Sequence, residues 1–398
     1  MARDNSLTFH TGHSLHSKDI IRIPESHTLH VGPAACARRH VIKAIEKNDA
    51  QNVSHLAISE DDLATGAYEQ QIVDALSDLL AMLPKQPRII LICLKCIDDL
   101  VGTDTDSLLE FVSDTFPQIR FAITRIDPIA LSKTVSPSEK NKATHYQFIE
   151  PGQPQDNGIT LAGSYERIPE DCELHEVLAS WGVGPVRNIL DCLTYQDYQD
   201  LGKSKACLCM TPMGKRAAQE LHSTTGIPWC NAPLGYNPMV IASFYRSLAT
   251  LLGKPAPLRL AEWEANAEAK LRTTAERASA YQFAVDSSAS MQSFLLAKTL
   301  LEHGFRVTCV TTKGVTDLER PAYDWIVSNH PATQIVRTHS YKALIEGAYG
   351  LSDNLIVIGA DFARMIGTRR AVDIWHDEGF CAFQGVSKLC DMIQEAAR

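Results

Sequence analysis

Short apolar runs of strand length alternate with helix-like stretches along almost the whole chain, and this alternation limits the fold more than any other feature. Residues 89–92, 206–210 and 355–359 are examples of the apolar runs. Continuous runs of this kind are typical of strands buried on both faces of a parallel sheet, with helices as the crossovers between strands. The sequence therefore predicts an α/β fold with mostly parallel sheets.

The alternation falls into three blocks, which predict three Rossmann-like domains. The expected segments are an N-terminal tail over residues 1–27, a first α/β domain over 28–156, a second α/β domain over 157–258, a helical linker over 259–278 and a third α/β domain over 279–398. The first domain is expected to end in a loop, because residues 136–157 are rich in Pro, Lys, Gln and Asn. A chain of 398 residues agrees with two or three domains of about 150 residues each.

Charge and hydropathy exclude several classes of protein. The formal net charge of −9 argues against broad binding to nucleic acid or to anionic membranes. No apolar run approaches the roughly 20 residues that a membrane-spanning helix needs, and the first residues lack the apolar core of a signal peptide. We therefore expect a cytoplasmic protein. Its 11 cysteines are then expected to be core residues, metal ligands or redox groups rather than disulfides.

Two cysteines end or begin short glycine-marked motifs. Cys36 closes the stretch His-Val-Gly-Pro-Ala-Ala-Cys, in which Gly-Pro is suited to open a helix. Cys96 follows the apolar run of residues 89–92 and precedes Gly102 and Asp104. Because α/β proteins bind ligands at the sheet edge where the parallel strands end, we expect both thiols there. Each cysteine alone also fits a buried core residue in a strand–helix turn, whereas the pair favours a metal cluster over a disulfide.

Cys93 and Cys96 also form a Cys-x-x-Cys pair. Residues three apart on a strand point to opposite faces of the sheet, so a shared metal site requires the strand to end between the two cysteines. Two such pairs would be typical of a zinc site, whereas one pair is a weak indication. Cys93 is therefore a secondary candidate.

Four motifs, taken in order, connect the sequence with a known family. They are the Gly-Pro-x-x-Cys turn that ends at Cys36, the acidic segment 58–67, Cys96 placed six residues before Gly102, and the helix that leads to Gly-Ile-Pro at residues 226–228. From about residue 28 onward, the chain resembles the component 1 subunits of nitrogenase and their relatives. The relatives include protochlorophyllide and chlorophyllide reductases, cofactor-assembly scaffolds and the nickel-tetrapyrrole reductase of methanogens.

The resemblance implies a subunit of an iron–sulfur reductase with Cys36 and Cys96 as cluster ligands. An ATP-dependent iron–sulfur reductase protein would deliver the electrons, since this chain has no phosphate-binding loop of its own. A 4Fe–4S cluster needs about four thiolates, and residues 1–35 contain no cysteine. The resemblance therefore implies a 4Fe–4S cluster shared across a subunit interface, either with a second copy of the chain or with a homologous component 1-type subunit, in a dimer or a heterotetramer.

Nitrogenase also holds an active-site metal cofactor, on one cysteine of the second domain and one histidine near the C-terminus. Cys207 and Cys209 lie near the first of these places in the sequence, and His376 lies near the second. The alternative interpretation is that they are two strand cysteines and a histidine beside a helix. The three residues are candidates for a pocket that binds a substrate, which the sequence does not identify.

Two other functions stay open at this point. The first is a cofactor-assembly scaffold of the same family, which holds a cluster or its precursor without turnover. The second depends on Asp286-x-Ser288-x-Ser290 after the predicted strand 282–285, which resembles the Asp-x-Ser-x-Ser pattern of von Willebrand A-type domains. Carboxylate and hydroxyl oxygens suit Mg²⁺, so these three residues would form a Mg²⁺-dependent binding module. The same residues also fit the cap of a helix that begins near Met291.

Overall fold

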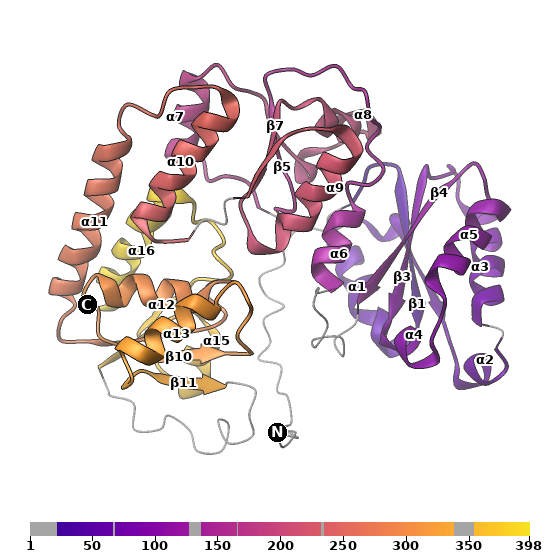
Figure 1. Ribbon diagram of the computed structural model, residues 1–398. Coiled ribbons are helices and arrows are strands. Elements are labelled where there is room, and N and C mark those ends of the chain that lie inside the picture. Colours follow the sequence, from indigo (N-terminus) through magenta and orange to yellow (C-terminus); the bar gives the residue numbers. More distant parts are fainter. Residues whose placement is uncertain (1–21, 67, 127–136, 165, 232–234, 338–353) are drawn as a thin grey trace. The chain divides into compact units, whose positions relative to one another are not determined.

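The computed structural model describes residues 22–66, 68–126, 137–164, 166–231, 235–337 and 354–398. These residues form two compact units (Figure 1). The N-terminal unit consists of the described residues within 22–164 and 183–231, and the C-terminal unit consists of those within 166–182 and 235–398.

The N-terminal unit contains two parallel sheets, of which the first carries the candidate cysteines. The strand order of this first sheet is β2-β1-β3-β4, and its strand pairs are parallel. The strands are β1 (Ser26–Gly32), β2 (Val53–Ala57), β3 (Ile89–Lys95) and β4 (Arg120–Ile126). The associated α-helices are α1 (Ala34–Glu46), α2 (Glu60–Ala64), α3 (Tyr68–Met82), α4 (Cys96–Val101), α5 (Thr105–Thr115) and α6 (Pro137–Thr144).

The two faces of the first sheet carry different residues. One face shares an apolar core with α3 and α5, through Leu29, Val31, Ile90, Ile92 and Leu94. The opposite face includes His30, whose ring stacks on the ring of His40 in α1 at a centroid distance of 4.8 Å. The alternation of side chains along each strand produces this division, and it leaves polar residues beneath α1.

Helix α6 lies within residues 136–157, which were expected to form a loop, so that expectation is wrong for this stretch. The helix has a polar sequence and starts with Pro137, which is well tolerated in a first helical turn. Lys142 is buried, and its Nζ donates a hydrogen bond of 2.7 Å to the carbonyl of Gly163. Tertiary contacts of this kind stabilise a helix whose composition alone does not predict one.

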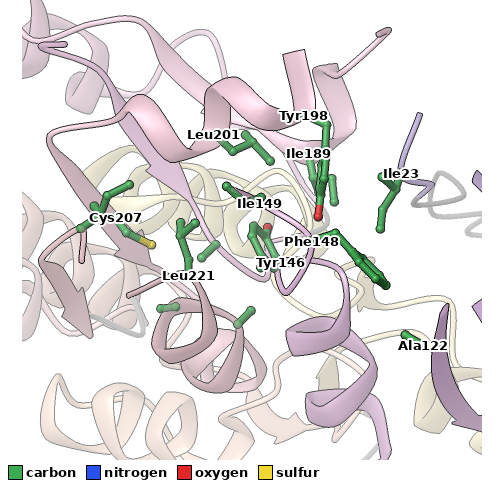
Figure 2. Packing of buried hydrophobic residues seen from close by; sticks show 14 of the residues in the cluster. Ile23, Ala122, Tyr146, Phe148, Ile149, Ile189, Tyr198, Leu201, Cys207 and Leu221 are labelled. Atoms are coloured by element: carbon green, nitrogen blue, oxygen red, sulfur yellow. The ribbon is translucent and has the colours of Figure 1, made fainter. Parts of the chain in front are cut away.

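The second sheet of the N-terminal unit has the order β6-β5-β7-β8, again with parallel pairs. Its elements are β5 (Ile159–Leu161), β6 (Val186–Asn188), α8 (Tyr195–Asp200), β7 (Ala206–Cys209), α9 (Lys215–Thr225) and β8 (Trp229–Asn231). One apolar cluster joins residues of both sheets, and Figure 2 shows Ala122 of β4 and Cys207 of β7 as members, with Tyr146 and Phe148 among the others. The two sheets of this unit therefore share a core.

The C-terminal unit contains the third sheet, of order β11-β10-β9-β12-β13 with parallel pairs. Its strands are β9 (Gln282–Val285), β10 (Val307–Thr312), β11 (Gln334–Arg337), β12 (Leu355–Ile358) and β13 (Ala371–Val372). The helices beside this sheet are α12 (Ser293–Glu302), α13 (Arg320–Asn329) and α15 (Asp361–Ile366).

A group of further helices completes the C-terminal unit. They are α7 (Glu173–Ser180), α10 (Pro238–Leu252), α11 (Leu260–Arg277) and α16 (Ala382–Ala396). The predicted helix over 259–278 is α11, which packs against α10 and α16 through buried residues such as Leu271. Three sheets of parallel strands confirm the predicted α/β fold class. The expected domain boundaries stay a prediction.

Candidate functional site

The order of the first sheet creates a topological switch point between β1 and β3. The chain passes from β1 to β2 on one side of β1, and then returns to β3 on the other side. The connections that leave β1 and β3 therefore diverge at the carboxyl ends of these strands. In open α/β sheets, ligands usually bind at such a switch point.

Cys36 and Cys96 follow β1 and β3, the two strands on either side of this switch point. Cys36 lies in the first turn of α1, four residues after Gly32 ends β1, and it is exposed. Cys96 is the first residue of α4, directly after β3, and it is half-buried. The parallel register pairs His30 of β1 with Cys93 of β3, so the two strands end beside each other. The structure thus brings both cysteines to one edge of one sheet, as the sequence predicts.

Cys36 lies in the first turn of α1. The backbone N–H of Cys36 donates a hydrogen bond of 2.9 Å to the carbonyl of Pro33, which fixes the first turn. The partial positive charge at the N-terminus of a helix stabilises an anion in this turn. Cys36 is therefore an accessible thiol in a position that suits metal binding.

Cys93 lies inside the sheet rather than at its edge. Strand β3 ends at Lys95, so the strand does end between Cys93 and Cys96. The Cys93 thiol is buried, and burial raises its pKa. It accepts a hydrogen bond of 3.5 Å from Nζ of Lys95. These observations favour a structural role for Cys93.

Sequence reasoning missed the polar residues beneath the two cysteines. His30 and Lys95 are buried on the face that α1 covers, and Nζ of Lys95 lies 3.0 Å from Nδ1 of His30. His55 of β2 lies nearby, with its Nε2 3.0 Å from the carbonyl oxygen of Gly32. The available signals were the histidine that begins the Cys36 motif and the lysine that ends an otherwise apolar strand directly before Cys96.

The donor set at this edge fits part of an iron–sulfur site. Among the described residues, no group of three or more His, Cys, Asp or Glu side chains is arranged to hold a metal ion. Two thiols, Cys36 and Cys96, are nevertheless present at one sheet edge, and thiolates are the ligands that iron–sulfur clusters require. The two thiols therefore supply ligands of the kind that part of such a cluster requires.

Cys207 and Cys209, the pocket candidates of the second sheet, are fully buried in β7. Burial raises the pKa of Cys209 to about 12 and raises that of Cys207 as well. The Cys209 thiol donates a hydrogen bond of 3.2 Å to the carbonyl of Thr211. Both thiols are therefore protonated core residues in this structure, which favours the alternative interpretation as strand cysteines.

His376 belongs to the C-terminal unit, and Cys207 and Cys209 belong to the N-terminal unit. The backbone of His376 is left-handed, with φ of +47°, and its ring stacks on that of Trp375 at 4.4 Å between centroids. Its backbone N–H donates a hydrogen bond of 2.8 Å to the carbonyl of Ser288. A left-handed histidine is uncommon and marks a turn that its surroundings hold in place.

The Asp-x-Ser-x-Ser motif makes hydrogen bonds within the protein. The Asp286 carboxylate accepts from the hydroxyl of Ser288 at 2.6 Å, from the hydroxyl of Thr311 at 2.8 Å and from the backbone N–H of Phe362 at 2.8 Å. Ser290 donates instead to Asp377, at 2.8 Å. Asp286 thus occupies the carboxyl end of the third sheet and caps the first turn of α15, which favours a structural role over a Mg²⁺ site.

Three sheets of parallel strands, with two cysteines after adjacent strands of the first sheet, define an α/β protein. The sequence of residues 20–369 matches the family described as nitrogenase component 1 type oxidoreductases. The chain belongs to this family, which confirms the predicted resemblance. A comparison with curated proteins finds no match.

Solved nitrogenase structures share the fold. The structure titled "Nitrogenase Cp1 at pH 6.5" aligns with a TM-score of 0.68 and 13% identity, over 94% of this chain and 89% of that chain. The structure titled "Nitrogenase Cp1 at pH 5" aligns with a TM-score of 0.60 and 14% identity, over 94% of this chain and 85% of that chain. In the described part of the chain, no helix has both the length and the apolar character to cross a bilayer.

Proposed function

We propose that the chain is a cytoplasmic subunit of a nitrogenase-like reductase, in which Cys36 and Cys96 ligate a 4Fe–4S cluster shared with a second chain. The observation that carries the proposal is the position of the two thiols. They follow the adjacent parallel strands β1 and β3 at a switch point, in a chain of the nitrogenase component 1 family.

The exposed surface beside Cys36 supports a second chain as the source of the remaining ligands. Ile42 and Ile45 of α1 are 43% and 59% exposed, and Val101 of α4 is 47% exposed. Exposed apolar side chains on the two helices that begin at the cysteine motifs suit a subunit interface. The partner is either a second copy of this chain or a homologous component 1-type subunit.

When bound, the cluster would supply one-electron transfer. Cys36 and Cys96 would hold it at the sheet edge, and the helix N-terminus at α1 would stabilise the Cys36 thiolate. The family resemblance supports an ATP-dependent iron protein as the electron donor. The substrate is the part of the proposal that the residues do not define.

Anaerobic reconstitution with iron and sulfide tests the cluster. We expect a brown protein with about four iron atoms per two chains, and loss of most of this iron in Cys36→Ala and in Cys96→Ala. Cys192→Ala is the matched control, because Cys192 is also half-buried but follows β6 of the second sheet and donates to the carbonyl of Asn188. This control is expected to keep the iron.

A colourless wild-type protein after reconstitution, or equal iron in the wild type and both site variants, would overturn the proposal. Sedimentation of the loaded and iron-free proteins then checks that the cluster joins two chains. Electron transfer from an iron protein with ATP to a candidate substrate separates a reductase from a scaffold, since a scaffold keeps its iron but gives no turnover.

A further inference from the structure

Lys95 is the last residue of β3, beside the switch point, and it is 4% exposed. A Cβ atom on Gly32 would lie 2.7 Å from Cγ of Lys95, so the stem of the lysine crosses the end of β1. Gly32 has φ of +142°, which residues with a side chain rarely adopt. The glycine of the Gly-Pro-x-x-Cys turn thus leaves room for a lysine that directly precedes Cys96.

Within the described part of the chain, the hydrogen-bond partners of the Lys95 ammonium are neutral groups. Its Nζ lies 3.0 Å from Nδ1 of His30 and 3.5 Å from Sγ of Cys93. Burial first, and the charge of Lys95 second, lower the pKa of His30 to about 3, so this ring is neutral. Burial raises the pKa of the Cys93 thiol, so the thiol is protonated. Neither neighbour offsets the positive charge.

Lys95 forms no ion pair with any carboxylate in the described part of the chain. Asp98 accepts from the backbone N–H of Lys95 at 2.9 Å and from the hydroxyl of Tyr68, rather than from the ammonium. A buried cation without a counter-anion is costly, since the protein interior solvates it less well than water does. An anion bound at this sheet edge would remove that cost.

We infer that Lys95 is a charge-compensating residue, whose ammonium offsets the negative charge of the cluster held by Cys36 and Cys96 and raises its reduction potential. This inference rests on the proposed function. Reduction adds one electron to the cluster, and a fixed cation in surroundings of low dielectric constant favours the more negative state. Lys95 would therefore change the potential of the cluster without binding its iron.

The midpoint potential of the reconstituted protein tests this inference. Lys95→Met keeps the length of the stem and removes the charge, and we expect the equilibrium constant for one-electron reduction to fall about tenfold, which is about 59 mV. Lys95→Arg keeps the charge and is expected to keep the potential near that of the wild type. Lys142→Met is the matched control, because Lys142 is also buried in the N-terminal unit but donates to the carbonyl of Gly163.

The thermal unfolding temperature of the iron-free proteins is a second test. If Lys95 only packs against its neighbours, its replacement should lower this temperature. Lys95→Met is expected to unfold at the same or a higher temperature than the wild type, because it removes a buried charge that has no anion. A lower unfolding temperature would assign Lys95 a structural role and overturn the inference.

The two proposals fail in different ways. A wild type without iron overturns the proposed function. A loaded Lys95→Met protein with the wild-type potential overturns only the role of Lys95. Loss of iron from Lys95→Met, with the unfolding temperature of the iron-free protein retained, supports charge compensation.

Discussion

Tyr68 donates a hydrogen bond from its hydroxyl to the buried carboxylate of Asp98, and this bond connects the start of α3 with the turn that carries Cys96. The second oxygen of Asp98 accepts from the backbone N–H of Lys95 at 2.9 Å. Both carboxylate oxygens of Asp98, two residues after Cys96, therefore accept a hydrogen bond. The direction in which the chain leaves β3 is fixed by these two bonds.

Removal of the Tyr68 hydroxyl is expected to loosen this turn. Tyr68→Phe leaves a buried carboxylate with one donor fewer, which should lower the free energy of unfolding by about 1–3 kcal/mol. Urea unfolding of the iron-free protein measures the change. Tyr195→Phe is the control. The Tyr195 hydroxyl accepts a hydrogen bond of 3.3 Å from the exposed Arg120, and we expect a loss of less than about 0.5 kcal/mol there. Equal losses in the two variants would contradict a special role for the bond to Asp98.

Gly32 is expected to tolerate no side chain. In Gly32→Ala the new Cβ would meet Cγ of Lys95 at 2.7 Å, at a φ of +142°. Steric overlap and backbone strain together should cost about 2–4 kcal/mol, and the reconstituted variant should hold less iron because the ends of β1 and β3 are displaced.

Gly182→Ala separates the effect of steric overlap from the effect of backbone strain. Gly182 also has a positive φ, of +65°, but nothing lies within 4 Å of a Cβ atom placed on it. The strain at Gly182 should cost about 1 kcal/mol. If both variants unfold at the same urea concentration, the contact with Lys95 contributes nothing.

The sequence predicts those parts of the fold that depend on local patterns. Strand β9 occupies the predicted residues 282–285. Its apolar residues 283–285 are buried, and such a short apolar run is a local pattern that can be read without knowledge of the neighbouring strands. Helix α6 was missed because its stability depends on the carbonyl of Gly163, which lies 21 residues beyond Lys142. No local pattern in a polar segment reports such a contact.

The candidate site also combines features that local patterns predict with features that depend on contacts between distant residues. Cys36 and Cys96 were predicted at one sheet edge because Gly-Pro marks a helix start before Cys36 and an apolar strand precedes Cys96. The pair then only needs the strands before the two cysteines to be parallel. The burial of Lys95 was not predicted, because a lysine at the end of a strand is normally exposed. Its burial requires that β1 lie beside β3 and that Gly32 provide the space, which only the strand order reveals.

Asp286 is expected to stabilise the third sheet without a metal ion. Its carboxylate accepts hydrogen bonds from Ser288, Thr311 and the backbone of Phe362. Asp286→Ala would leave these donors unpaired and should cost about 3 kcal/mol or more. The neighbouring Ser287→Ala is the control and should change the free energy of unfolding by less than about 0.5 kcal/mol.

Magnesium distinguishes this role from a Mg²⁺-dependent binding module. Thermal unfolding of the wild type is expected to be the same with MgCl₂ as with NaCl at equal ionic strength, because a ligand that binds only the native state would raise the transition. A rise with MgCl₂ that disappears in Asp286→Ala would favour the Mg²⁺ module instead.

Asp377 should make the stability of the protein depend on pH. Burial raises the pKa of its carboxyl from 3.8 to about 6, against the opposing effect of the hydrogen bond from Ser290. Between these two values the native state binds more protons than the unfolded state, so stability is full at low pH and falls as the pH rises through about 6. The difference corresponds to about 3 kcal/mol at most.

Asp377→Asn removes this titration while it keeps an oxygen that can accept from Ser290. Asparagine also tolerates the left-handed backbone of this residue, which has φ of +64°. The variant should therefore gain stability relative to the wild type as the pH rises from about 4 to about 7, measured as the difference between the two free energies of unfolding at each pH. Asp324→Asn, in which an exposed carboxylate of α13 is replaced, should show no such trend. A constant difference between Asp377→Asn and the wild type across this range would show that the Asp377 carboxyl has the same pKa in the native and unfolded states, and that its burial does not raise this pKa.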